Sequence, residues 1–281
     1  MSKFSVVTSV YKNDKPEFVK RALDSITILQ NRRPNEVVLV VDGAVPKELS
    51  ALINNYVNLS PDLYNVIWLP ENKGLGNALR VGVENAKYEI IARMDSDDVS
   101  ASDRFEKQIS YMENHPECDI VGGQITEFID SESNIVGKRE VPCSHDEIFT
   151  WLKGRCPFNH VSVTMLRSRV IAVGNYLDWH FNEDYYLWIR MAEAGYRFAN
   201  LPDTLVNVRV GREMYARRGG WKYFKSEKGL QDYMLRRKMI SFPRYFYNVL
   251  VRFVIQLAMP NKLRGFVFQK FARKKTGNEI L

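Results

Sequence analysis

A cluster of carboxylates follows an apolar run in the first half of the sequence. Residues 89–94 have the pattern of a buried strand, and Asp95, Asp97 and Asp98 come directly after it. Ligands of open α/β sheets bind outside the carboxyl ends of the strands. Mg²⁺ and Mn²⁺ are usually held there by one or two carboxylates together with substrate phosphates. The motif therefore predicts a divalent-metal site, unless it is only a polar loop in which Asp98 caps the next helix.

A second acidic pair, Glu183 and Asp184, lies at the start of a helix predicted over residues 181–190. Leu187 and Met191 are four positions apart, which is the spacing of one helix face. Acidic side chains at a helix N-terminus are sometimes present for no other reason than to complement the helix dipole. The position alone therefore leaves open whether this pair takes part in chemistry.

Strands and helices alternate along the part of the chain that leads to the first acidic motif. Strands are predicted over residues 3–10, 36–42, 65–69 and 89–94, and helices follow Pro16, Pro46 and Gly76. The run Val37–Val41 is typical of a parallel strand buried on both faces. This alternation, with right-handed crossovers, predicts an α/β fold with a mostly parallel, Rossmann-like sheet flanked by helices.

Each of these four strands ends in polar residues. They are Thr8 and Tyr11, then Asp42, then Asn72 and Lys73, and finally Asp95 and Asp97. Because the carboxyl ends of parallel strands meet at one edge of a sheet, all four groups are expected there together. This convergence favours a ligand site over a simple helix cap.

Several other classes of protein are disfavoured. The turn Gly74-Leu-Gly76 lacks the third glycine of a dinucleotide-binding motif, and no Gly-Lys-Ser/Thr phosphate loop occurs. The scattered cysteines Cys118, Cys143 and Cys156 indicate neither disulfides nor a zinc site, and they fit a reducing cytosol. There is no pattern of a signal peptide and no apolar stretch long enough to span a bilayer.

The ordered motifs resemble those of family 2 glycosyltransferases, the large inverting group with the GT-A fold. More narrowly, the chain is similar to bacterial transferases of exopolysaccharide, capsule or O-antigen assembly. The matching stretches are Thr8-Ser-Val-Tyr11, Val41-Asp-Gly43, Asn72-Lys-Gly-Leu-Gly-Asn77, Arg93-Met-Asp-Ser-Asp-Asp98 and Glu183-Asp184.

The resemblance implies a role for each motif. Asp97, helped by Asp95, would hold Mn²⁺ or Mg²⁺ against the departing nucleoside diphosphate. Asp184 would be the general base for the acceptor hydroxyl, with Glu183 as the less favoured candidate. Asp42 would accept the ring N–H of uracil. The remaining nucleotide-sugar-binding residues would be Thr8 and Tyr11 at the base and ribose, Lys73 near the phosphates, Ser96, and Arg209.

Two assignments stay open at this point. Arg209, Arg212, Arg217 and Arg218 could clamp the diphosphate bidentately, or they could belong to a membrane-facing charge. His160 could orient the acceptor or the diphosphate. A lone histidine next to an apolar strand, here predicted over residues 161–166, is more often a hydrogen-bonded structural residue.

The end of the chain is strongly basic. Residues 209–281 hold 18 Lys and Arg against 4 Asp and Glu, in a chain whose total charge is only +7. A polar stripe at spacing four runs along an otherwise apolar helix, and residues 262–275 again combine apolar helical spacing with Lys and Arg. Such helices are typical of a membrane interface, although they could instead pack on the core. Nucleic acid is not predicted as a partner, because the aromatic residues share the apolar face. The stripe consists of Arg244, Asn248, Arg252 and Gln256.

We therefore expect a GT-A domain over residues 1–218 and a basic amphipathic helical extension over residues 219–281. Within the domain, residues 1–98 would bind the nucleotide and residues 99–218 the acceptor. The expected protein is peripheral on the inner face of the bacterial cell membrane. It would move a sugar from a nucleotide-sugar, with UDP-sugars favoured, to a lipid-linked saccharide.

The expected reaction is nonprocessive, because the Gln-x-x-Arg-Trp motif of processive synthases is missing; Gln231-Asp-Tyr-Met-Leu-Arg236 does not match it. A sugar-nucleotide pyrophosphorylase is disfavoured because residues 5–14 contain no glycine for its activation loop. A noncatalytic nucleotide-sugar-binding module is disfavoured because Asp95, Asp97 and Asp184 are all intact.

Overall fold

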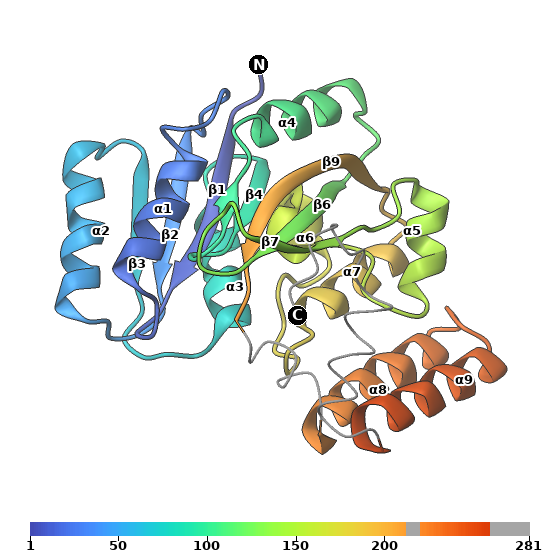
Figure 1. Cartoon of the computed structure of the whole chain (residues 1–281). Helices are drawn as coiled ribbons and strands as arrows, with labels where there is room; N and C mark the ends of the chain where they lie inside the picture. The colour runs from blue at the N-terminus through green and yellow to red at the C-terminus, as the bar shows by residue number, and fades with distance from the viewer. Residues whose placement is uncertain (212–219, 259–281) are drawn as a thin grey trace.

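The computed structural model describes residues 1–211 and 220–258 (Figure 1). Its first part alternates strands and helices as the sequence predicts, with element ends shifted by one or two residues. Pro16 occupies the first turn of its helix, where its missing N–H has no helical partner to lose. The elements are β1 (Phe4–Val10), α1 (Pro16–Ile26), β2 (Glu36–Val41), α2 (Lys47–Leu59), β3 (Tyr64–Trp68), α3 (Leu75–Asn85) and β4 (Ile90–Met94).

The second part is less regular. Its elements are β5 (Val99–Ser100), α4 (Arg104–Asn114), β6 (Ile120–Phe128), β7 (Ile135–Arg139), α5 (His145–Leu152), β8 (Thr164–Leu166), α6 (Arg167–Ala172), α7 (Glu183–Glu193) and β9 (Phe198–Arg209). Ser144 and Glu147 begin α5 with a capping box, and this helix was not predicted from the sequence. The strand predicted over 161–166 is shorter, because His160–Ser162 form a 3₁₀ turn.

Within the described residues, nine strands form one sheet in the order β3-β2-β1-β4-β8-β6-β9-β5, and β7 pairs with β6. The strands β3, β2, β1 and β4 are parallel. β8 then runs antiparallel to both β4 and β6, whereas β6 and β9 are parallel. The sheet is thus parallel in its first four strands along the chain and mixed beyond them. The acidic motif begins directly after the buried strand β4.

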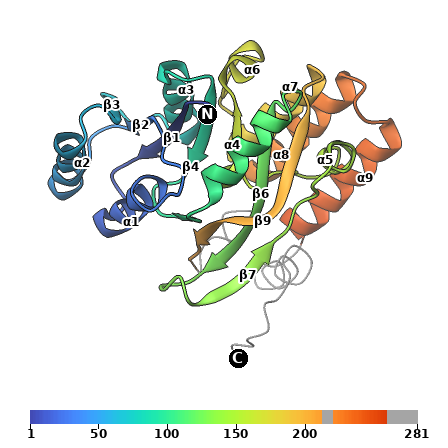
Figure 2. The ribbon, with the colours of Figure 1, turned by 90° about the horizontal axis from the view of Figure 1, so that it is seen from above.

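Two apolar clusters cover the two faces of this sheet. The first contains buried side chains of α1, α2 and α4, and the second contains those of α3, α5, α6 and α7. Figure 2 shows α3 and α7 on one side of the strands and α1 on the other. Successive residues of β1 alternate between the clusters, with Val6 in the first and Val7 in the second. Helices on both faces explain why β2 is buried along its whole length.

Two further helices, α8 (Trp221–Arg236) and α9 (Phe242–Phe253), lie side by side below the second half of the sheet (Figure 1). A π-helical turn, Val254–Ala258, continues α9. Leu230 and Met234 of α8 are fully buried in the same cluster as α7. Among the helices that the structure describes, none combines the length and the apolar character needed to cross a bilayer.

Candidate active site

The acidic motif begins where β4 ends, at the carboxyl edge of the parallel strands. In the sheet register, Thr8 of β1 lies opposite Met94, and Val41 of β2 lies opposite Val10. The chain segments that follow β1, β2 and β4 therefore leave the sheet next to one another. Thr8, Asp42 and Asp95 are brought to one edge in this way.

Asp42 organises the turn that leads into α3. Its two carboxylate oxygens accept the backbone N–H groups of Lys73 and Gly74, each at 2.9 Å. The Nδ2 group of Asn72 donates to the Asp42 carbonyl at 3.1 Å. Gly43 has a φ of +83°, and a Cβ there would meet the Asn72 backbone nitrogen at 2.6 Å. Much of the Asp42 hydrogen-bonding capacity is thus used inside the protein, and its contact with uracil stays a prediction.

The carboxylates after β4 are crowded. Arg93, which is buried, forms an ion pair with Asp95. Asp14 from the loop after β1 accepts the Ser96 hydroxyl at 2.9 Å and the Tyr11 N–H at 3.0 Å. Burial raises the pKa of Asp97 to about 6, and the charges of Asp95 and Asp14 add to this effect. Three carboxylates therefore oppose one another's ionisation at this edge.

Asp98 holds the motif to the far end of β9. Its carboxylate accepts the backbone N–H of Arg209 at 2.7 Å, and the Arg209 Nε donates to the Asp97 carbonyl at 3.2 Å. The guanidinium of Arg209 also lies 3.8 Å from the ring centroid of Phe18. Burial, then Asp95 and Asp97, raise the pKa of Asp98 well above its ordinary value. Asp98 is thus a buried anchor, and Arg209 lies against the motif as its predicted role requires.

A divalent cation fits this donor set. Within the described residues, no three His, Cys, Asp or Glu side chains are arranged to enclose a metal ion. Mg²⁺ and Mn²⁺ do not need such a cage, since they take one or two carboxylates and complete their shell with phosphate oxygens and water. The mutual repulsion that raises the pKa of Asp97 is relieved by a cation. Asp95 and Asp97 would be the residues that hold it.

The second acidic pair lies in the first turn of α7. Burial and the neighbouring Asp184 raise the pKa of Glu183 to about 7. Burial also raises the pKa of Asp184, whereas the backbone N–H of Tyr185 and the cation of Arg139 lower it. The thiol of Cys156 donates to the Asp184 carboxylate at 3.7 Å. Burial thus raises the pKa of both carboxylates, and the pKa of Glu183 lies near neutral pH.

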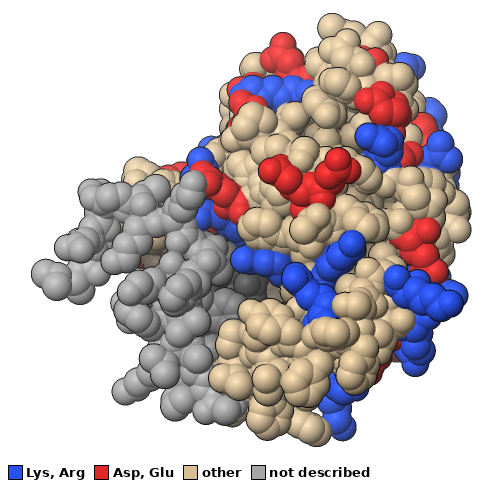
Figure 3. Space-filling model, turned by 90° about the vertical axis from the view of Figure 1, so that its right-hand side faces the viewer, with Lys and Arg blue, Asp and Glu red and all other residues tan. Residues whose placement is uncertain are grey.

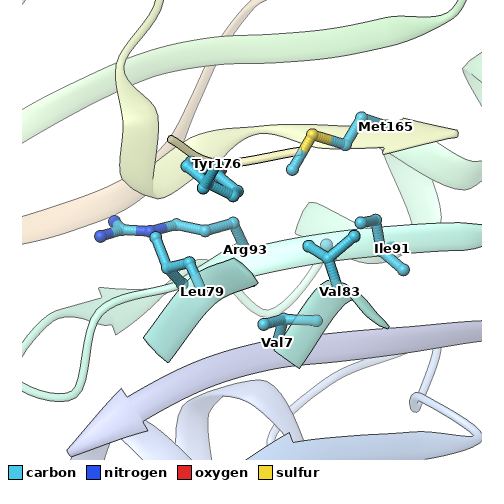
Figure 4. Close-up of a pocket in the computed structure, with 8 residues that line it drawn as sticks. Val7, Leu79, Val83, Ile91, Arg93, Met165 and Tyr176 are labelled. Carbon is cyan, nitrogen blue, oxygen red and sulfur yellow. The ribbon is translucent and has the colours of Figure 1, made fainter. Parts of the chain in front are cut away.

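His160 faces the protein interior. Its Nε2 is hydrogen-bonded to the Tyr176 hydroxyl at 2.8 Å. Burial, with a contribution from Arg93, lowers the pKa of His160 well below its ordinary value, so the ring is neutral. In Figure 4, Arg93 lies between Leu79 and Tyr176. The small cavity that these residues line is otherwise bordered by apolar side chains of the core.

A cleft next to the acidic pair offers room for substrates. It has a volume of about 610 Å³. One wall is the N-terminal part of α3 with Lys73, Asn77 and Arg80, and the other is the segment 176–183, which ends at Glu183. Gly76 and Glu183 approach each other closely, since a Cβ on Gly76 would lie 3.4 Å from the Glu183 Cβ. The cleft is therefore lined by residues of the glycine-rich turn and by Glu183 of the second acidic pair.

The remaining predicted residues differ in their surroundings. Tyr11 is exposed, Thr8 is buried, and Lys73 forms an ion pair with Glu71 at 2.9 Å. Arg212, Arg217 and Arg218 lie outside the described residues. The sequence analysis missed Asp14, Arg93 and Cys156 as neighbours of the two acidic pairs. Asp14 follows a strand end and could have been included on that ground, whereas no local pattern points to Cys156.

Solved structures share this architecture. The Staphylococcus aureus TarS fragment 1–349 with UDP-GlcNAc has a TM-score of 0.67, at 17% identity over 96% of this chain and 76% of its own. A mannosyltransferase from Pyrobaculum calidifontis with GDP-Man and Mn²⁺ has a TM-score of 0.62, at 16% identity over 96% of this chain and 76% of its own. At these identities the likeness shows the fold, which is the GT-A type.

Sequence comparison then gives the family. Residues 5–174 match Glycosyl transferase family 2, and residues 90–264 match Glycosyl transferase family group 2. The amylovoran biosynthesis glycosyltransferase AmsE of Erwinia amylovora is 39% identical, over 95% of this chain and 98% of its own. The UDP-Gal:alpha-D-GlcNAc-diphosphoundecaprenol beta-1,3-galactosyltransferase of Escherichia coli is 32% identical, over 97% of each chain. The chain belongs to glycosyltransferase family 2.

Proposed function

We propose that the protein is an inverting, nonprocessive glycosyltransferase that moves a sugar from a nucleotide-sugar to a lipid-linked saccharide acceptor. The supporting observation is the meeting of two acidic pairs from distant parts of the chain. Burial and Asp184 raise the pKa of Glu183 most, and the charge of Asp95 adds to this rise. Asp95 and Asp97 would serve the donor, and Glu183 and Asp184 would serve the acceptor.

On the donor side, the proposed site is the sheet edge. A bound Mn²⁺ or Mg²⁺ would offset the negative charge that develops on the nucleoside diphosphate as it leaves. Asp95 and Asp97 would hold the cation, and Arg209 and Lys73 would contact the diphosphate. Thr8, Tyr11, Asp42 and Ser96 would position the base and ribose.

On the acceptor side, Asp184 is the proposed general base. Inversion requires one displacement at the anomeric carbon, in which the acceptor hydroxyl attacks opposite the leaving group. That hydroxyl becomes acidic only as its bond to the sugar forms, so a carboxylate can take its proton late. Asp184 is oriented by Cys156 and lies at the N-terminus of α7. Glu183, which faces the cleft, is the alternative base.

The substrate class is inferred from the relatives. The Escherichia coli enzyme is named for UDP-Gal as donor and for a saccharide on a diphosphoundecaprenol lipid as acceptor. The Erwinia enzyme is named for amylovoran biosynthesis. Alignment over nearly the full length of both relatives supports the same class here: a UDP-sugar donor, a lipid-diphosphate saccharide acceptor, and a place in surface-polysaccharide assembly. Such an acceptor favours a peripheral protein on the inner face of the cell membrane.

Asp97→Asn tests the donor site. Calorimetric binding of UDP in the presence of Mn²⁺ should weaken by at least tenfold, because the variant removes one carboxylate from the cation. Asp62→Asn on the exposed surface is the matched control and should leave binding unchanged. Full sugar transfer in excess EDTA, or an unchanged UDP affinity in Asp97→Asn, would contradict the metal site. A protein that binds UDP-sugars but neither transfers nor hydrolyses them would be the noncatalytic module.

A further inference from the structure

Helix α9 is amphipathic, but its orientation is the reverse of that of an ordinary surface helix, because its apolar face points outward. Six apolar and aromatic side chains of α9 and of the turn after it are 45–66% exposed and point away from the protein, whereas three polar side chains are 3–8% exposed and face the enzyme. Arg244, the first residue of the predicted polar stripe, is exposed. Surface helices of globular proteins normally bury the apolar face. The exposed set, here called the α9 outer face, consists of Phe242, Phe246, Tyr247, Leu250, Phe253 and Val254. The buried set is Asn248, Arg252 and Gln256.

Specific bonds hold the polar stripe inward. Asn248 donates to the Lys153 carbonyl and to the Gln231 side chain, both at 2.8 Å. Arg252 donates to the Gly154 carbonyl at 2.8 Å and forms a buried ion pair with Glu227 at 2.7 Å. Rolling the helix to hide its apolar face would leave these buried charges and amides without their partners, which is strongly unfavourable. The outward orientation of the apolar face is therefore built into the fold.

The surroundings of the α9 outer face match a lipid surface. Trp221 at the start of α8 is also exposed, and Trp and Tyr are enriched at membrane–water interfaces. Figure 3 shows Lys and Arg side chains bordering a wide uncharged area at the level of α8 and α9. The acids of α8, Glu227 and Asp232, are both engaged in ion pairs with basic partners. Exposed basic residues around the pair are Lys222, Lys225, Arg236, Lys238 and Arg244.

We propose that the α9 outer face, with Trp221 and this basic border, docks the enzyme on an anionic lipid bilayer. The apolar side chains enter the boundary between headgroups and acyl chains, and the basic residues contact anionic headgroups. The described helices lie on the bilayer and do not cross it, as their length and composition require.

The same two helices hold both segments that carry the acceptor base. Through Asn248 and Arg252, α9 binds the carbonyls of Lys153 and Gly154, just before Cys156, whose thiol contacts Asp184. Through Ser226, α8 donates to the His180 carbonyl at 2.7 Å and accepts from Asn182 at 3.0 Å, just before Glu183. Docking thereby sets the position of the base relative to the bilayer. This second step rests on the proposed function, since it assumes that the acceptor hydroxyl belongs to a lipid-linked saccharide.

Vesicle flotation of the full chain tests the surface. The wild type should bind vesicles of phosphatidylcholine and phosphatidylglycerol at 3:1, and bind pure phosphatidylcholine less. High salt should release only part of it, because screening weakens the ionic contacts and leaves the apolar ones. Phe246→Ser with Leu250→Ser should lower the partition coefficient on the order of tenfold or more. The matched control, Ile28→Ser with Leu59→Ser, removes exposed apolar side chains elsewhere and should bind as the wild type does.

Three further readouts separate the occupants of the face. In the docking proposal, the melting temperature and UDP-sugar hydrolysis of Phe246→Ser with Leu250→Ser stay at wild-type values, since these side chains contact solvent in the free enzyme. Unchanged vesicle binding would overturn the proposal. A fall in melting temperature with vesicle binding intact would also overturn it, because residues 259–281 would then occupy the face. Conversion of a dimer to a monomer would overturn it as well, because a second copy of the chain would then occupy the face. If the wild type does not hydrolyse UDP-sugars, the proposed function is overturned and the docking proposal still stands.

Discussion

At the scale of single residues, the site is a place where carboxylates are kept close together against their mutual repulsion. Asp97 and Glu183 have pKa values raised to about 6 and about 7, in both cases chiefly by burial. Groups with perturbed pKa values cluster at functional sites, where burial and neighbouring charges are arranged to shift them. Arg93 is the buried cation between the two pairs, since it lowers the pKa values of Glu183 and Asp184 and pairs with Asp95.

The identity of the base can be decided by two isosteric variants. Asp184→Asn keeps the shape of the side chain and removes proton acceptance, so transfer should fall by roughly 10² to 10⁴ with little change in donor affinity. Glu183→Gln should retain more activity. Single-turnover transfer together with calorimetric UDP binding measures both effects. The reverse pattern, with Glu183→Gln inactive and Asp184→Asn active, would exchange the two roles.

Glu183 should also make stability depend on pH. Its folded-state pKa of about 7 exceeds its ordinary value of 4.5, so the folded chain holds the proton more tightly than the unfolded chain. Unfolding therefore releases a proton between these pH values, and stability falls as pH rises through this window. Glu183→Gln should be more stable than the wild type at pH 8, by at most about 3 kcal/mol, and the difference should vanish near pH 4.5.

Thermal melts across this pH range measure the effect. Glu48→Gln, on the exposed side of α2, is the control and should show no such pH-dependent gain. If the melting temperatures of the wild type and of Glu183→Gln change in parallel from pH 4.5 to 8, this result would contradict the raised pKa of Glu183.

At the scale of elements, α3 packs closely against the sheet next to the candidate site. Gly82 allows this close approach, because a Cβ there would lie 2.5 Å from the Cγ1 of Val7 in β1. The start of α3 carries the turn that Asp42 holds, so the packing at Gly82 fixes where Lys73 and Gly74 present their N–H groups. A glycine in the middle of a helix is otherwise unfavourable.

Alanine at two glycines of α3 should have opposite effects. Gly82→Ala should destabilise the protein by about 1 to 3 kcal/mol, since the short Val7 side chain cannot move away. Gly76→Ala meets only ordinary contacts at 3.4 Å and should be neutral or stabilising by up to about 1 kcal/mol. Denaturant unfolding of the two variants measures the sign of the change in the free energy of unfolding. A stable Gly82→Ala protein would show that α3 is free to shift.

At the scale of the whole molecule, α8 is joined to the catalytic body by its core. Leu230 and Met234 are fully buried in the cluster that also contains Trp188 and Leu187 of α7. The predicted boundary at residue 218 falls inside the stretch 212–219, outside the described residues. Because α8 shares this cluster with α7, we expect α8 and the second half of the sheet to unfold together.

Leu230→Ala tests this coupling. The variant should lower the stability of the whole protein by about 2 to 5 kcal/mol, through lost transfer energy and the cavity left behind. Calorimetry should show one transition that moves to lower temperature. Leu59→Ala, at an exposed position on α2, should leave the transition temperature unchanged. A new, separate low-temperature transition in Leu230→Ala would mean that the extension is an independent domain.

The sequence alone determined the strand–helix alternation, the acidic motifs and the family. These features are local: buried parallel strands are runs of Val and Ile, and functional side chains follow the strand ends. The early elements therefore agree with the structure to within one or two residues. The helix α5 also had a local signal, the capping box of Ser144 and Glu147, although it lay in a region without clear periodicity.

Only the tertiary structure decided which residues meet. Asp184 and Cys156 come from different elements, as do Asp14 and Ser96, and no pattern in the chain links them. For α9, helical spacing separates a polar face from an apolar face but does not say which one contacts the protein. That choice depends on Glu227 and on the carbonyls of Lys153 and Gly154, which are distant in sequence and satisfy the polar stripe once the fold has formed.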